Sequence, residues 1–185
     1  VGDRVFGTPG FHEPFVALDA SSGSLIETYQ ETKGTVEFVV DDDRMFAVVG
    51  VLDRKSYDDN RRRGLSIPVP GNKRLVAIDS QSGHVLWQKS DVTTSNLLPS
   101  TLSVSDGRLF FHSPRQLVCL DAATGQLEWA IRHAAGHPAG LALLDPSKGL
   151  GSRLVVAPRG GRAVLVIAGR DGEVLWKHGV PGGIA

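Results

Sequence analysis

The 185-residue chain has one cysteine, one methionine and no apolar run long enough to span a membrane. As the lone cysteine, Cys119 cannot form a disulfide within the chain, and its place in an apolar run predicts a small core side chain. Lys and Arg together number 20, as do Asp and Glu, so the net charge is zero. This balance argues against nucleic acid as a partner, and the missing apolar span argues against direct membrane insertion.

The sequence also lacks the motifs of several common chemistries. It contains no Gly-x-Ser-x-Gly segment and no phosphate-binding loop ending in Gly-Lys-Ser/Thr. His133 and His137 have the spacing of two metal ligands on one helix face, but Gly136 and Pro138 disfavour a helix there. The acidic run 41–43 is predicted to be a solvated turn between two strands.

Tryptophan is scarce but regularly placed. All three tryptophans stand four residues after a glycine, in segments that read LVAIDSQSGHVLW, LVCLDAATGQLEW and VLVIAGRDGEVLW. A weaker copy, FVALDASSGSLIE, has Glu27 in the tryptophan position. The turn glycines of the four copies are 60, 42 and 47 residues apart, at Gly23, Gly83, Gly125 and Gly172. Periods of about 40 to 50 residues are typical of solenoids and propellers.

Each copy has the chemistry of a β-hairpin. The acids Asp19, Asp79 and Asp121 can accept hydrogen bonds from the backbone amides of their own turns. The glycine suits a left-handed backbone position that closes a hairpin with a bulge. The fourth copy has Ala168 in place of the acid, so its turn is expected to be less well held. The repeated acids and glycines are therefore predicted to be structural.

Further strands precede these hairpins. They are predicted at 4–7, 44–50, 108–113 and 153–158, and before three of those at 35–42, 100–107 and 139–145. The runs are apolar at both odd and even positions, which is typical of strands covered on both faces. Each unit is therefore predicted to be a four-stranded antiparallel blade of a β-propeller. Trp87, Trp129 and Trp176 are expected to pack against the next blade, each with its indole N–H bonded to a backbone carbonyl.

The predicted fold class is all-β, a partial β-propeller of about four blades that forms a single domain over residues 1–185. The blades are expected at about 1–34, 35–94, 95–136 and 137–185. A closed propeller has about four to eight blades, and we expect this segment to be part of a seven- or eight-bladed ring. The remaining blades would come from the same longer chain or from a second copy.

The motif L-V-x-L-D-x-x-[ST]-G-x-x-x-W resembles the repeat of pyrroloquinoline quinone (PQQ)-type β-propellers, and its four copies cover essentially the whole chain. The resemblance implies one of two functions. Quinoprotein dehydrogenases with such blades bind PQQ and Ca²⁺ at the propeller axis and oxidise alcohols or sugars. Other members hold no cofactor and bind protein partners, among them the propeller lipoprotein of the bacterial outer-membrane assembly machinery.

The residues favour the second, non-catalytic branch. Methanol-type dehydrogenases of the family carry a vicinal disulfide over the quinone, which a single cysteine cannot supply. No acid stands out as a proton acceptor, and no set of oxygen ligands for Ca²⁺ can be singled out. No catalytic, cofactor-binding or metal-binding residue is therefore predicted. PQQ and Ca²⁺ are expected only if the chain is a fragment of a dehydrogenase.

The longest interval between repeats contains an insertion at 51–74. It is charged and places Arg61, Arg62 and Arg63 close to Tyr57. Long loops on a rigid scaffold either carry binding sites or are disordered, and both alternatives stay open here. As a binding loop it would contact a partner or an anionic ligand through Tyr57 and the arginines, because guanidinium groups suit carboxylates and phosphates. Alternatively, the three acids of the insertion neutralise the arginines.

The function predicted from these features is a scaffold segment that binds a protein partner or a small ligand, unidentified, in a bacterial cell envelope protein. The alternative is a fragment of a PQQ- and Ca²⁺-dependent dehydrogenase. A periplasmic or other extracytoplasmic location follows from the resemblance only.

Overall fold

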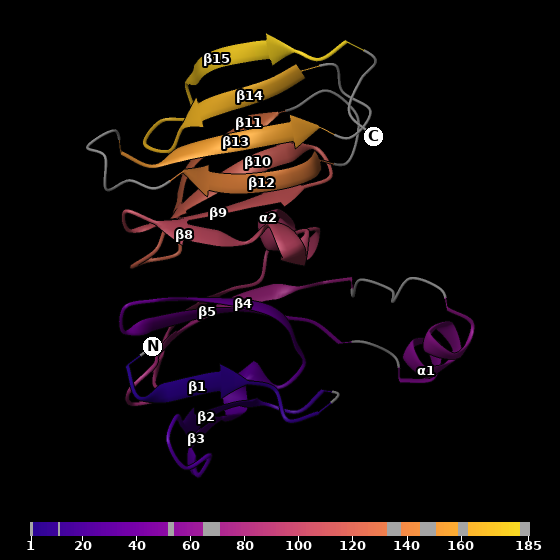
Figure 1. Cartoon of the computed structure of the whole chain (residues 1–185), viewed down its shortest axis with the longest axis vertical. Helices are drawn as coiled ribbons and strands as arrows, with labels where there is room; N and C mark the ends of the chain where they lie inside the picture. Colours follow the sequence, from indigo (N-terminus) through magenta and orange to yellow (C-terminus); the bar gives the residue numbers. More distant parts are fainter. Residues whose placement is uncertain are drawn as a thin grey trace. The chain divides into compact units, whose positions relative to one another are not determined.

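The computed structural model describes residues 2–10, 12–51, 54–64, 71–132, 138–144, 151–158 and 163–181. Over these residues the chain forms one three-stranded and three four-stranded antiparallel sheets, which are labelled by strand in Figure 1. The all-β fold class predicted from the repeats is confirmed. The chain divides into two compact units, Val1–Asn96 and Leu97–Ala185, and each unit holds two of the sheets.

The first unit contains the three-stranded sheet and one four-stranded sheet. The former consists of β1 (Arg4–Gly7), β2 (Phe15–Asp19) and β3 (Leu25–Tyr29), and the latter of β4 (Thr35–Asp41), β5 (Arg44–Val49), β6 (Arg74–Asp79) and β7 (Val85–Lys89). The helices of this unit are η1 (Gln30–Thr32), α1 (Arg54–Arg62) and α2 (Val92–Ser95). One core joins the two sheets and includes Phe15, Ala17 and Tyr29 from the first and Met45, Ala47, Val49, Val76 and Ile78 from the second.

The second unit contains two four-stranded sheets. One consists of β8 (Ser103–Ser105), β9 (Arg108–Ser113), β10 (Gln116–Asp121) and β11 (Leu127–Arg132), preceded by the turn η2 (Pro99–Thr101). The other consists of β12 (Pro138–Leu144), β13 (Arg153–Pro158), β14 (Ala163–Ala168) and β15 (Val174–Gly179). Their shared core includes Phe110, Leu117 and Cys119 from the first sheet and Leu154, Val156 and Ile167 from the second.

The middle strands are buried on both faces, as their sequences predict. Residues 45–49 of β5 are each at most 5% exposed, and residues 117–120 of β10 are each at most 2% exposed. Odd and even positions alike are therefore shielded from solvent. Such two-sided burial explains why these runs are continuously apolar and do not alternate with polar residues.

The repeat turn has the same backbone in all four copies. In the third copy the Gly125 amide donates to the Asp121 carbonyl at 2.8 Å, and the Asp121 amide donates to the Gln126 carbonyl at 2.9 Å. Gly125 has a φ of 70°, in the left-handed region that glycine adopts at no steric cost. The register of the hairpin shifts between Cys119 and Leu120, which is the bulge that the sequence predicts.

The insertion at 51–74 is not a loop throughout, because α1 forms within it. The Arg54 Nε lies 3.7 Å from the Asp58 carboxylate, and Arg62 pairs with Asp59 one turn further on. Ion pairs three or four residues apart stabilise a helix, and the basic residues of the last turn interact favourably with its C-terminal end. The sequence shows no apolar periodicity over this stretch, so it did not predict the helix.

The strand predicted at 100–107 is also shorter than expected. Pro99 begins η2, and the ladder of β8 starts only at Ser103. The His112 amide donates to the Thr101 hydroxyl at 2.9 Å, so a side chain takes the place of a ladder partner. The cause is the proline, which has no N–H and fixes its own φ, so a turn replaces the first strand residues.

The blade boundaries and the single-domain reading stay predictions. The strands of the four sheets span residues 4–29, 35–89, 103–132 and 138–179. Within the described part of the chain, no helix is both long and apolar enough to cross a membrane.

Candidate functional site

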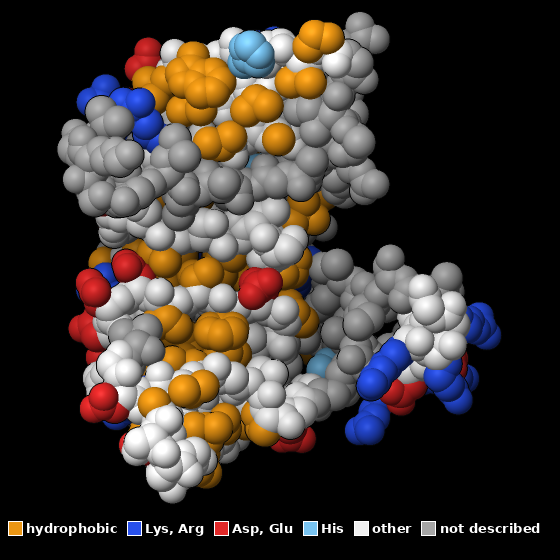
Figure 2. Space-filling view, in the orientation of Figure 1, with side chains coloured by type: hydrophobic (Ala, Val, Ile, Leu, Met, Phe, Trp, Pro, Cys, Tyr) orange, Lys and Arg blue, Asp and Glu red, His pale blue; other side chains and the backbone are white. Residues whose placement is uncertain are grey.

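The helix α1 carries a local excess of positive charge on a chain that is neutral overall. Residues 54–63 contain five Lys or Arg and two Asp, which gives a net charge of +3. Figure 2 shows the blue side chains of Lys and Arg gathered around this helix with few red ones. Asp58, Arg61 and Arg62 line a shallow hollow on its surface. The arrangement is suited to an anionic group, because guanidinium donors match carboxylate and phosphate oxygens.

The three consecutive arginines differ in whether they form an ion pair. Arg62 pairs with Asp59 on the same helix, although its side chain is still 75% exposed. Arg61 and Arg63 are exposed, and no carboxylate among the described residues lies within ion-pair distance of either. Tyr57, the other predicted contact residue, lies on α1, but its side chain is outside what the structure describes. Two guanidinium groups are thus open to an external anion.

The repeated turn acids are engaged within their own turns. The Asp19 Oδ1 accepts from the hydroxyls of Ser21 and Ser22 at 2.6 and 2.8 Å, and from the Ser22 amide at 2.8 Å. The Ser21 hydroxyl, and then that of Ser22, lower the pKa of Asp19 to about 2. The Ser82 amide and hydroxyl lower the pKa of Asp79 in the same way. A carboxylate with these partners is a structural acceptor and a poor general base.

The third and fourth turns follow the same principle with different residues. The Thr124 hydroxyl donates to Asp121 Oδ1 at 2.7 Å and is the main cause of a lowered pKa there. In the fourth turn, where Ala168 replaces the acid, Asp171 accepts from the Glu173 amide at 3.0 Å. The fourth turn keeps its backbone hydrogen bonds, with Gly172 N to Ala168 O at 2.9 Å. Asp171 thus holds part of a turn that the sequence predicts to be loose.

These acids make the stability of the protein depend on pH in the acid range. Because the folded pKa of Asp19 is about 2 and those of Asp79 and Asp121 are also lowered, their contribution is complete above the unfolded pKa of about 3.9 and is lost as pH falls toward 2. We expect Tm to fall between pH 5 and pH 2.5. In the triple variant Asp19→Asn, Asp79→Asn and Asp121→Asn, the amide oxygens still accept but do not titrate, so the fall should be smaller. Equal falls would contradict this account.

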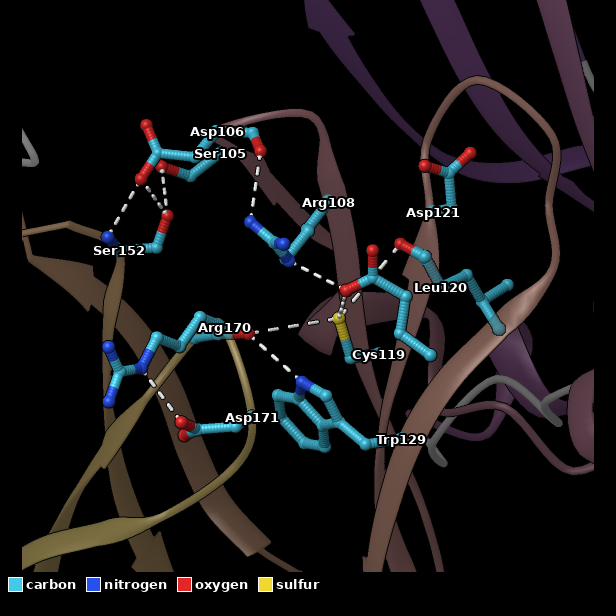
Figure 3. Close-up of polar contacts among 12 residues, drawn as sticks. Ser105, Asp106, Arg108, Cys119, Leu120, Asp121, Trp129, Ser152, Arg170 and Asp171 are labelled. Carbon is cyan, nitrogen blue, oxygen red and sulfur yellow. Dashed lines mark hydrogen bonds and ion pairs between the residues drawn. The ribbon is translucent and has the colours of Figure 1, made fainter.

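Trp129 joins the two sheets of the second unit, as Figure 3 shows. Its indole Nε1 donates to the carbonyl oxygen of Gly169 at 3.0 Å, which is the hydrogen bond predicted for the repeated tryptophan. The centroid of its ring lies 6.0 Å from the centroid of the Phe110 ring in the same sheet. Gly169 follows β14, so the bond runs from the last strand of one sheet to the hairpin turn of the next. Trp129 is therefore part of the structural contact between repeats.

Polar groups surround this contact. Arg108 Nε lies 2.6 Å from Glu128 Oε2, and Ser152 donates to Asp106 Oδ2 through its amide at 2.8 Å and its hydroxyl at 2.6 Å (Figure 3). Cys119 is buried beside the ion pair, and its burial, with the nearby Glu128 carboxylate, raises the pKa of the thiol. A thiol that stays protonated is a poor nucleophile, so Cys119 acts as a core side chain.

In the first unit a tyrosine takes the role of the tryptophan. The weaker copy has Glu27 at the tryptophan position, and Tyr29 two residues later donates from its hydroxyl to the Ser80 carbonyl at 2.7 Å. Arg4 donates to the same oxygen at 2.9 Å. Ser80 and Gly169 occupy the same position in their repeat turns, because each comes directly after the first residue of its turn. The two-residue alternation places Tyr29 on the same face of its strand as Glu27, but the sequence does not show that the Ser80 carbonyl is its acceptor.

Comparison with known proteins gives the family. The family model described as outer membrane protein assembly factor BamB matches residues 16–184. The chain belongs to this family. Among proteins with curated functions, none matches the chain.

Several solved structures resemble this BamB-family chain in fold. BamB from Moraxella catarrhalis is 19% identical with a TM-score of 0.54, and the match covers 96% of this chain and 46% of that one. The computationally designed Ika8 protein is 11% identical with a TM-score of 0.64, over 99% of this chain and 48% of that one. The quinohemoprotein alcohol dehydrogenase ADHIIG from Pseudomonas putida is 18% identical with a TM-score of 0.60. That match covers 99% of this chain and 34% of the dehydrogenase chain.

These matches confirm the prediction of a partial β-propeller. The chain spans about half the length of the first two matched structures, at 48% and 46%. At such identities the likeness shows the fold alone, so the dehydrogenase match carries no information about activity.

Among the described residues of this BamB-family chain, no group of three His, Cys, Asp or Glu side chains is placed to hold a metal ion. In the acidic run 41–43, Asp41 is the last residue of β4, and Asp42 and Asp43 form the exposed hairpin turn that leads into β5. The two histidines with metal-ligand spacing, His133 and His137, lie outside the described residues, as does Asp53, one of the three acids of the insertion.

Proposed function

We propose that the chain is a non-catalytic propeller segment of a bacterial cell envelope protein, and that it binds an acidic protein surface through α1. Membership in the family described as an outer membrane protein assembly factor supports a role in the envelope. The observation that carries the binding role is the exposed pair Arg61 and Arg63, which have no carboxylate within ion-pair distance in the described part of the chain.

The physical case for α1 rests on its charge and its exposure. The helix and the following arginine carry a net charge of +3, while the whole chain carries none, so an acidic partner is attracted to this segment rather than to the protein as a whole. Complementary charges steer a partner to the surface and fix its orientation. Arginine also forms paired hydrogen bonds with a carboxylate, which adds geometric selectivity.

Replacing Arg61, Arg62 and Arg63 together by Ala tests this proposal. The immobilised chain would be incubated with a bacterial envelope extract, and the captured proteins would be quantified by mass spectrometry. We expect the amount of specifically captured partner to fall roughly tenfold in the triple variant. This factor corresponds to a loss of about 1.4 kcal/mol of binding free energy. Capture by the wild type should also weaken at high salt, because the charges are exposed and screened.

A matched control is Arg170→Ala. Arg170 is also exposed, at 76%, and pairs with the neighbouring Asp171, but it lies far along the chain in the second unit. We expect this variant to capture the same proteins as the wild type. If the triple variant also captures the wild-type set in the wild-type amount, α1 is not the binding surface and the proposal fails.

A further inference from the structure

One side of α1 carries charges of alternating sign. Arg54, Asp58 and Arg61 stand four and three residues apart, so they lie on the same side of the helix at successive turns, about 5.4 Å apart along its axis. All three side chains are exposed. Asp58 and Arg61, together with Arg62, also line the hollow on the helix surface. The hollow is therefore lined by a carboxylate as well as by cations.

The Asp58 carboxylate is open to a partner. Its side chain is 50% exposed, and the Arg54 Nε lies 3.7 Å away, which is beyond hydrogen-bond distance. Asp59 differs, because Arg62 donates a hydrogen bond to it and its side chain is only 36% exposed. Of the two acids of α1, Asp58 is thus the more available to a donor from outside the helix.

This carboxylate changes which acidic partners fit α1. A partner that carries only acids gains from the arginines but brings its own negative charges close to Asp58, and like charges placed together across an interface are unfavourable. A partner that carries a base between two acids can meet every charge on this side of α1 with the opposite sign. Both the attraction and the repulsion therefore favour the second kind of partner.

The spacing of the charges favours a helical partner. A second helix repeats its charged positions at the same distance per turn, about 5.4 Å, so its charges can stay opposite those of α1 at all three positions. On a strand, the side chains of one face recur about every 6.6 Å, so the mismatch with α1 grows from one position to the next.

We propose that α1 binds a helix of a partner protein on which a Lys or Arg is flanked by an Asp or Glu one turn before it and one turn after it. The two acids pair with Arg54 and Arg61, and the base pairs with Asp58. Such a segment has a net negative charge, which matches the net charge of +3 on residues 54–63. The inference rests on the binding role proposed for α1 and specifies the chemistry of the partner.

Three synthetic peptides of equal length test the order of the charges. Each is an alanine-rich helix held by a side-chain staple away from its charged face, and its successive turns carry Glu–Lys–Glu, Glu–Ala–Glu or Lys–Glu–Lys. Binding to the full chain is followed by the shifts of its backbone amide NMR signals, at about 0.15 M salt, where attraction between distant charges is largely screened.

We expect the Glu–Lys–Glu peptide to bind roughly threefold more tightly than the Glu–Ala–Glu peptide, which is the effect of one additional exposed ion pair. The Lys–Glu–Lys peptide should bind most weakly, because it places its bases opposite the arginines. Asp58→Asn keeps the shape of the side chain but removes its charge, so the two Glu peptides should bind this variant equally. Asp59→Asn removes the same charge from the same helix outside the hollow, and in this matched control the threefold preference should persist.

The peptides also separate this inference from the function on which it rests. If the Glu–Ala–Glu peptide binds the wild type as tightly as the Glu–Lys–Glu peptide or more tightly, the alternating partner is wrong, although α1 still binds acids. If replacing Arg61, Arg62 and Arg63 by Ala changes the binding of neither Glu peptide, the function proposed for α1 fails, and this inference fails with it.

Discussion

Trp129→Ala is expected to lower the free energy of unfolding by about 3 kcal/mol, at the lower end of the range for removing a large aromatic side chain. The lower end applies because the indole is only partly buried. The substitution removes the contact with the Gly172 turn and leaves the Gly169 carbonyl without its indole donor. Urea unfolding followed by circular dichroism measures the loss.

Two controls separate the parts of this effect. Trp129→Phe keeps most of the ring but loses the N–H, so about 1 kcal/mol should be lost through the hydrogen bond. Trp176→Ala removes the repeat-equivalent ring, which is 50% exposed and has no following sheet against it in the described residues, and should cost less than about 1 kcal/mol. If the Trp129→Ala and Trp176→Ala substitutions lower the free energy of unfolding equally, the ring of Trp129 does not act by joining sheets.

The sheets could be predicted from the sequence because their signals are local. The strands predicted at 108–113 and 153–158 match β9 and β13, since both are short apolar runs bounded by glycine or by a turn. The turn at Gly125 followed from an acid, a glycine and a two-residue alternation, all within about ten residues. Such features are determined by nearby residues, and they repeat, so each copy supports the interpretation of the others.

The rest could not be predicted, either because it depends on residues far apart in sequence or because the segment has no apolar pattern that indicates an element. Tyr29 replaces the tryptophan of the weaker copy only because Ser80, 51 residues later, presents a carbonyl to it. The helix α1 is stabilised by ion pairs on a polar segment with no apolar periodicity to reveal it. The open arginines of α1 were named from the sequence, but their exposure and their lack of described acidic partners are visible only in the structure.

Gly169→Ala is expected to destabilise the second unit by about 2 kcal/mol, within the range for inserting atoms into a packed site. The other three repeats have Ala20, Ser80 and Ala122 at this position, so sequence comparison of the repeats alone predicts no cost. In the structure, however, a Cβ on Gly169 would lie 2.7 Å from Ser152 Cβ and 2.9 Å from the Ser152 carbonyl oxygen. Thermal and urea unfolding would measure the difference.

The clash at Gly169 cannot relax easily, because its amide donates to the same Ser152 carbonyl at 2.8 Å and its own carbonyl accepts from Trp129. Gly7→Ala is the matched control, since a Cβ there meets nothing within 4 Å among the described residues and should change stability by less than about 0.5 kcal/mol. Ser152→Gly removes one of the clashing atoms, so its cost should be smaller in the Gly169→Ala background than alone. Additive costs in this cycle would show that Gly169 and Ser152 do not contact each other, and the close approach of these two residues would then be wrong.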